Sequence, residues 1–333
     1  MFNSILFIGM FWRVLSIRMW ILGFFLIAGL GAVFYLVLIQ GVESIATRQF
    51  LNQEQIIARA EASNVISFFQ VFGDSIVVLT QLSSMERRDA KTVQDLDVFT
   101  EQWRGSDLVG GVVLTDRNGL VQLNSNVLRI PDVGASLADQ DYFLRAKNNS
   151  YGGKYFVGQP VTSRLGGTKG QVIVPVAAPV YQKGVFAGVA AASVKLQPLT
   201  ERYLKLMKVS DLTEVYLIDR DGKILYSPVP DEVGLNVSEL LGDNIKNVFG
   251  TTQEGKLRRA TYLDPKSGKP QNRLIAYSTI FLGDQTWQLI ISSASQNVAD
   301  LTVPIQIRQT AILILVSLTI LLFGIIVAKE NKT

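Results

Sequence analysis

Carboxylates are the side chains of this 333-residue chain best suited to acid–base chemistry, because the sequence contains no histidine and no cysteine. That absence excludes His-based catalytic triads, thiol nucleophiles, disulfides and zinc sites with Cys or His ligands. The acidic residues with the most suggestive spacing are Asp139, Asp141, Asp219 and Asp221, which would be candidates for a general acid and base.

The surroundings of these carboxylates favour a structural role over catalysis. Three of the four lie in stretches typical of loops or turns, and the sequence has no glycine-rich phosphate loop and no nucleophile elbow. We interpret Asp116, Arg117, Asp219 and Arg220 as turn and strand-end residues. We therefore expect no enzymatic activity, no metal site and no cofactor.

The charge balance is mild, with 32 basic and 28 acidic residues and a formal net charge of +4. No run of five or more Lys or Arg residues occurs. A nucleic acid is therefore not an expected partner.

Two uncharged apolar stretches, residues 19–42 and 309–328, are each long enough to cross a bilayer, which takes about 20 residues. The first stretch could also be a signal peptide cleaved near Ala46, but its apolar core is longer than the usual 7–15 residues or so. We therefore predict two transmembrane helices, with residues 1–18 at the cytoplasmic interface and 329–333 as a short cytoplasmic tail.

Basic residues set the predicted orientation. Arg13 and Arg18 precede the first span, and Lys329 and Lys332 follow the second. The positive-inside rule then places both termini in the cytoplasm and residues 43–308 outside the inner membrane of a bacterium.

The outer segment begins with helical periodicity. Apolar residues recur at helical spacing from Ile45 to Leu82, and no proline occurs before Pro131. We predict a long helix followed by a second helix at residues 90–104, together covering 43–104. The apolar stripe of the long helix is either core or partly the seam of a dimer.

After these helices the sequence contains an internal repeat. VGGVVLTDRNGLVQLNS (109–125) and LTEVYLIDRDGKILYSP (212–228) both predict a strand, a tight Asn-Gly or Asp-Gly turn and a second strand. Asp132-Val133-Gly134 then matches Glu232-Val233-Gly234, and a later hairpin at 172–194 matches one at 274–293. The repeat predicts two α+β modules, at 105–205 and 206–300.

With these motifs in order, residues 42–308 resemble the double Cache (dCache) family of bacterial extracytoplasmic sensors. The resemblance rests on the paired DRNG and DRDG hairpins, on DVGASLADQDYFLRA (132–146) and on VIVPVAAPVYQKGVFAGVAAASV (172–194). It implies an α+β fold in which two stacked PAS-like modules lie along a long N-terminal helix, flanked by two transmembrane helices.

The resemblance also implies a small-ligand pocket in the membrane-distal module, between the helix carrying Asp-Tyr-Phe and the strands that follow. Polar and aromatic residues around the 172–194 hairpin are the candidates to line it, while Ala190, Ala191, Ala192 and Gly188 leave space above the sheet. The candidate ligand-binding residues are Tyr142, Arg145, Tyr155, Gln159, Arg164 and Ser193, with Tyr151 nearby.

One subfamily binds free amino acids through Arg-x-Trp-Tyr ahead of an alanine and an Asp on the last distal strand. Aligned on Ala146, this chain has Gln140, Asp141, Tyr142 and Phe143, and it has Ser193 in place of that Asp. A ligand bound as an amino-acid backbone is therefore disfavoured, and the ligand class stays open, since Arg145 or Arg164 can pair with an anion.

Family members usually continue after the second span into a HAMP linker and then a kinase, cyclase or chemoreceptor tail, whereas here only 329–333 follow. We expect a homodimeric, membrane-anchored ligand sensor without its own output domain, which serves as a chemotaxis or two-component input and signals through a membrane or cytoplasmic partner. The alternative is an accessory membrane subunit whose modules dock proteins.

Overall fold

The computed structural model describes residues 2–148, 154–207, 210–242, 245, 254–263 and 269–330. The chain divides into two compact units. One contains the residues up to Phe50 and those from Ser295 onward, and the other contains Leu51–Ala294. We refer to them as the helical unit and the mixed unit.

The helical unit is built from two apolar helices. It contains the N-terminal part of α1 (Phe2–Thr80) and α7 (Gln296–Glu330), both of which include stretches long and apolar enough to span a membrane. Their large side chains, such as Phe34 and Phe323, are exposed, as expected for a surface that faces lipid. The hydroxyls of Tyr35 and Thr310 contact each other between the two helices.

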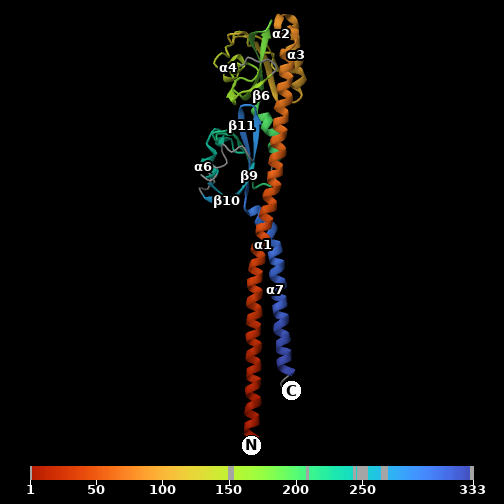
Figure 1. Ribbon diagram of the computed structural model, residues 1–333, viewed down its shortest axis with the longest axis vertical. Helices are drawn as coiled ribbons and strands as arrows, with labels where there is room; N and C mark the ends of the chain where they lie inside the picture. Colours follow the sequence, from red (N-terminus) through yellow and green to blue (C-terminus); the bar gives the residue numbers. More distant parts are fainter. Residues whose placement is uncertain are drawn as a thin grey trace. The chain divides into compact units, whose positions relative to one another are not determined.

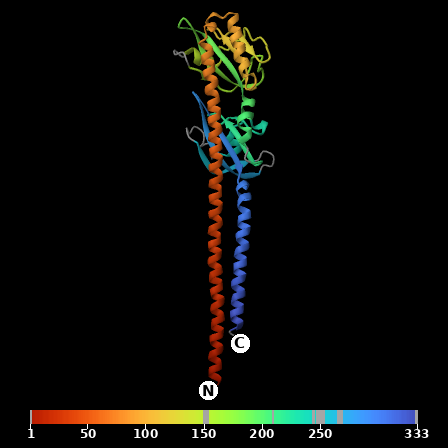
Figure 2. The ribbon, with the colours of Figure 1, turned by 90° about the vertical axis from the view of Figure 1, so that its right-hand side faces the viewer.

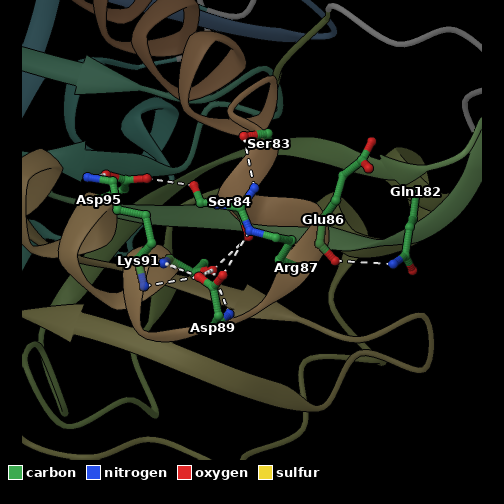
Figure 3. A network of polar contacts seen from close by, with 9 residues as sticks. Ser83, Ser84, Glu86, Arg87, Asp89, Lys91, Asp95 and Gln182 are labelled. Atoms are coloured by element: carbon green, nitrogen blue, oxygen red, sulfur yellow. Dashed lines mark hydrogen bonds and ion pairs between the residues drawn. The ribbon is translucent and has the colours of Figure 1, made fainter.

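Within the mixed unit, α1 continues to Thr80 and is followed by α2 (Ser83–Arg87) and α3 (Ala90–Arg104). The connection is fixed by caps and ion pairs (Figure 3). The Asp89 side chain accepts hydrogen bonds from the first amides of α3, and Ser84 and Lys91 both contact the carboxylate of Asp95, at 2.6 and 2.8 Å. Such an N-cap contributes about 1 kcal/mol to helix stability.

The first module is an antiparallel sheet with strand order β2-β1-β6-β5-β3, to which β4 adds by pairing with β5. Its elements are β1 (Val109–Thr115), β2 (Val121–Asn126), α4 (Asp141–Asn148), β3 (Phe156–Val157), β4 (Val161–Thr162), β5 (Val172–Gln182) and β6 (Val185–Lys195). Two short helices, α5 (Leu196–Tyr203) and η1 (Lys205–Met207), then lead to the second module.

The second module repeats this arrangement, with strand order β8-β7-β11-β10-β9. Its elements are β7 (Thr213–Ile218), β8 (Ile224–Tyr226), η2 (Pro230–Glu232), α6 (Val237–Leu241), β9 (Gly255–Leu263), β10 (Pro270–Leu282) and β11 (Gln285–Ala294). In both modules the central pair of long strands forms a hairpin, β5–β6 and β10–β11.

The repeated hairpins are built from the same hydrogen bonds. The carboxylate of Asp116 accepts from the amides of Asn118 (2.8 Å) and Leu120 (3.0 Å), and that of Asp219 accepts from Asp221 (2.9 Å) and Lys223 (2.8 Å). Gly119 and Gly222 follow with φ near 85° and 83°, a conformation that favours glycine. The internal repeat is confirmed, and the carboxylates of Asp116 and Asp219 hold the turns.

Both sheets pack on α1, which is the orange helix beside them in Figures 1 and 2. One continuous apolar core joins α1 residues such as Phe69, Phe72 and Ile76 to β6 of the first module and β11 of the second. The predicted fold class is therefore confirmed: an α+β protein with two related sheets on one long N-terminal helix and an apolar helix at each end. Most of the apolar stripe of the helix is core, while Ile45, Ile56 and Leu82 are exposed.

Candidate ligand pocket

The face of the first sheet that turns away from α1 carries a small cavity of about 30 Å³. This is room for about two water molecules. The walls come from β1, β2, β5, β6, α4 and the loop at 163–171. The lining residues are Gly110, Gly111, Val112, Val113, Ser125, Asn126, Asp132, Tyr142, Leu165, Gly167, Thr168, Ile173, Pro175, Ala191, Ala192 and Ser193.

Small residues open this space. Gly110 and Gly111 on β1 and Ala191 and Ala192 on β6 leave little side chain above the sheet. A Cβ built on Gly110 would lie 2.0 Å from the Cγ2 of Thr168, which is far inside van der Waals contact. The loop that carries Thr168 can therefore cover the pocket only because residue 110 is glycine.

Asp132 supplies the charge at the pocket. Its Oδ1 accepts a hydrogen bond from the Gly166 amide at 2.6 Å, and its Oδ2 accepts from the side-chain amides of Asn124 and Asn126, both at 3.3 Å. All three of these donors are neutral. The carboxylate is therefore oriented on both oxygens by neutral groups, and it forms no ion pair with the residues that the structure describes.

Two of the six candidate residues from the sequence, Tyr142 and Ser193, line this cavity. Tyr142 comes from α4 and is buried, and burial raises the pKa of its hydroxyl. Ser193 is on β6 opposite Gly111, with its Oγ 3.5 Å from the Gly111 carbonyl oxygen. Both side chains are neutral at physiological pH, so they offer hydrogen bonds and shape to a ligand.

The two candidate arginines have carboxylate partners. One guanidinium nitrogen of the exposed Arg164 contacts both oxygens of Asp139, at 2.8 and 2.7 Å, and this hydrogen bond lowers the pKa of Asp139. Arg145 on α4 pairs with Asp141 at 2.8 Å and with Asp284 of the β10–β11 turn at 3.2 Å. Neither arginine is among the residues that line the cavity.

The remaining candidates lie elsewhere. Tyr155 precedes β3 and packs on α1, where a Cβ on Gly73 would fall 2.4 Å from its ring. Gln159 is exposed between β3 and β4 and is not part of the cavity wall. Tyr151 lies outside the described residues.

The sequence analysis did not select Asp132 or Asn126 as pocket residues. A signal for Asp132 was available in the repeat itself, because Asp132-Val133-Gly134 matches Glu232-Val233-Gly234. In the structure Asp132 lines the cavity, and Glu232 is buried. Asn126 carries no such signal, because only the strand pairing puts it opposite Gly111.

The corresponding place in the second module is filled by protein side chains. When the two sheets are aligned by their strand registers, Glu214 stands at the position of Gly111. In the same way Arg273 stands at the position of Ile173, and Ser292 at that of Ser193. Glu214 and Arg273 form an ion pair at 3.2 Å across this site. The cavity of the first module thus corresponds to a charged core contact in the second.

This contact is buried and tightly bonded. Arg273 is 5% exposed, donates to the Leu212 carbonyl oxygen at 3.0 Å and lies 4.6 Å over the ring of Tyr262. Glu232, the counterpart of Asp132, is 2% exposed and accepts a hydrogen bond from Ser227, and burial raises its pKa. The second module therefore places the Arg273 side chain where the first module has its cavity.

A Cache domain family model, the double Cache model dCache_1, matches residues 42–301. The chain therefore belongs to the double Cache family, whose members are ligand-binding sensor domains. The mixed unit is a sensor input module, and the resemblance inferred from the hairpins is confirmed. No curated protein matches the chain in sequence.

Solved structures of sensor domains share the fold. An extracellular ligand-binding receptor from Desulfohalobium retbaense superposes with a TM-score of 0.59 at 14% identity, over 73% of this chain and 40% of that receptor. The ligand-binding domain of the Pseudomonas aeruginosa amino acid chemoreceptor PctB, in complex with L-Arg, gives 0.54 at 18% identity over 75% and 95%. The ligand-binding domain of the Pseudomonas fluorescens chemoreceptor CtaA, in complex with L-serine, has a TM-score of 0.54 at 16% identity. The match covers 75% of this chain and 99% of that domain.

The Glu214–Arg273 ion pair in the second module predicts that removing one partner destabilises the fold more than removing both. Arg273→Met leaves Glu214 and Glu232 without their shared cation in a buried site, so the free energy of unfolding should fall by about 3 kcal/mol. Chemical unfolding of the mixed unit within the full chain measures this loss. The double variant Glu214→Leu/Arg273→Met should recover most of it, and an equal or larger loss in the double variant would contradict the ion pair.

Proposed function

We propose that the chain is an extracytoplasmic sensor module that binds a small ligand in the cavity of the first module. The observation that carries this proposal is the contrast between the two repeats, in which Gly111 and Ile173 leave a space that Glu214 and Arg273 fill. Tyr142, Ser193 and Asp132 then offer convergent polar groups over mostly apolar walls, the usual composition of a small-ligand site.

The charge of the lining selects among ligands. Of the residues lining the cavity, Asp132 alone carries a formal charge. A carboxylate ligand would face this charge without a cation, since Arg164 and Arg145 have acidic partners of their own. We infer that the ligand is a small amine or other compact cation, whereas amino acids, the ligands of the PctB and CtaA structures, also carry a carboxylate.

The loop over the cavity provides a way to admit such a ligand. The Gly166 amide donates to Asp132, and the loop contains Gly166, Gly167 and Gly170. A cation that binds Asp132 competes with that amide, and the loop can lift by rotation at the glycines. The cavity is small, about 30 Å³, so movement of the loop would make room for a larger ligand.

The apolar helices support a membrane setting for the sensor. Two apolar helices flank the Cache domain. We propose that they anchor it in a bacterial inner membrane with residues 43–308 outside and both termini in the cytoplasm, and that the signal passes to a membrane or cytoplasmic partner.

A panel of matched small molecules tests the ligand class. Thermal unfolding of the full chain in lipid nanodiscs is measured with ethylammonium, ethanol and acetate at equal concentration, and with their four-carbon homologues. Amines should raise the melting temperature, by about 5 °C at a ligand concentration of about 100 times Kd, while acetate and ethanol should not. Asp132→Asn should remove the shift, and the exposed Asp97→Asn should keep it.

A shift with the carboxylates instead of the amines would refute the cation assignment while keeping the sensor proposal. A flat panel, together with a stoichiometric protein partner in mild detergent, would favour the alternative of an accessory docking subunit.

We also propose that the sensor is a homodimer through the exposed side of α1. Ile56, Val71 and Val78 recur there at helical spacing and are 64%, 59% and 61% exposed. Since the chain has no cysteine, Ser67→Cys on the same side should yield a disulfide-linked dimer on mild oxidation. Gln122→Cys, exposed on β2, should stay monomeric; equal crosslinking of both would contradict this interface.

A further inference from the structure

A second polar site lies at Glu54, whose carboxyl group is buried and has no counter-ion among the described residues. Glu54 on α1 is fully buried, and its Oε1 accepts a hydrogen bond from the Ser293 hydroxyl of β11. The Ser293 Oγ lies 2.9 Å from the Thr213 Oγ1, which is 3.1 Å from the Ser210 Oγ. The Glu54 Oε2 has no hydrogen-bond partner among the described residues.

This pair joins the two chain segments that connect the mixed unit to the apolar helices. α1 runs without a break from the helical unit through Glu54. On the other segment, β11 ends at Ala294, one residue after Ser293, and α7 begins at Gln296. A change in the Glu54–Ser293 contact therefore acts where the domain is covalently tied to both helices.

Four charged groups on the neighbouring strands and on α1 have partners of their own among the described residues. Glu214 on β7 and Arg273 on β10 pair with each other on the opposite face of the sheet. Ser293 is in register with Thr213 and Leu274, and the residues next to these on each strand, Glu214 and Arg273, point to the other face. On β9 and before it, Lys256 bonds to Asn52 and Glu254 pairs with Arg59. Among the side chains that the structure describes, the adjoining segments also carry Arg48 and Glu61 of α1, Asp211 before β7, and Asp300 and Arg308 of α7.

We propose that Glu54 and Ser293 form a proton-controlled clasp between α1 and β11, closed when Glu54 is protonated and loosened when Glu54 ionises. The pH outside the membrane is then a second input, independent of the ligand pocket. The protonated carboxyl is neutral and fits the buried site, whereas the carboxylate would draw water or a cation into it.

The titration range is suited to such a role. Burial raises the pKa of Glu54 to about 7, and the hydrogen bond from Ser293 opposes that rise. Since the pKa is higher in the closed state than in an open one, the closed state is favoured most at low pH. The stability of the closed state relative to the open one falls as the pH rises from about 4.5 to about 7, and it stays low at higher pH.

Hydrogen exchange on the full chain in nanodiscs tests the clasp. After correction for the intrinsic exchange rate, protection of peptides covering 51–58 and 289–294 should fall at least about tenfold between pH 5 and pH 8. Glu54→Gln, which mimics the protonated side chain, should keep high protection at both pH values. The matched control Glu61→Gln, on the same helix, should behave like the parent chain.

Removal of the serine gives a second, independent readout. Ser293→Ala deletes a hydrogen bond that favours the ionised form, so the pKa of Glu54 in the closed state should rise. The pH above which protection stops falling should therefore move to a higher value, even if protection is lower overall. Parent protection that does not change with pH, or a pH response that persists in Glu54→Gln, would overturn the proposal. If Glu54→Gln does not fold, a Ser293→Ala variant in which the pH response levels off at the parent pH or below it overturns the proposal equally. None of these readouts requires a ligand, so failure of the clasp is distinct from failure of the sensor proposal.

Discussion

Both β-sheets of this chain share one apolar core with the same helix, and the rest of the structure depends on that core. Phe68 and Phe72 of α1 meet Trp103 of α3 edge-on, with ring centroids 6.0 and 5.0 Å apart, while Phe69 meets Trp287 of β11 at 5.8 Å. Full burial of one such side chain contributes about 1.5–3 kcal/mol. Two modules that would each have a small core thereby share a large one.

The shared core also decides where a ligand can bind. α1 covers one face of each sheet with apolar side chains, and the small cavity of the first module and the Glu214–Arg273 ion pair of the second lie on the other face. The two repeats then differ by a few side chains. Gly111 and Ile173 leave the first site open, whereas Glu214 and Arg273 close the second, so one scaffold yields one pocket and one structural ion pair.

Local patterns were enough to predict the fold but only part of the pocket. The Asp-Arg-Asn-Gly and Asp-Arg-Asp-Gly turns were predictable because Asp116 and Asp219 bond to amides two and four residues ahead. Tyr142 and Ser193 were found because the family resemblance implies a pocket between the helix carrying Asp-Tyr-Phe and the strands that follow.

The other candidates depend on contacts that are distant in sequence. Tyr155 packs on Gly73 of α1, and Arg145 forms an ion pair with Asp284 in the other module. The direction in which either side chain points therefore cannot be predicted from the residues next to it in sequence. Likewise, nothing near Glu54 in the sequence indicates that Ser293 will be its hydrogen-bond donor.

The most direct test of the shared core is whether the two modules unfold together. The absence of native cysteine allows a double variant, Ala178→Cys on β5 and Ala276→Cys on β10, with both positions buried in the folded chain. Thiol labelling across a urea titration, read separately for the two peptides, reports each module in the same molecule. One core predicts coincident labelling midpoints. Clearly separated midpoints would show that the modules are independent and would contradict the account.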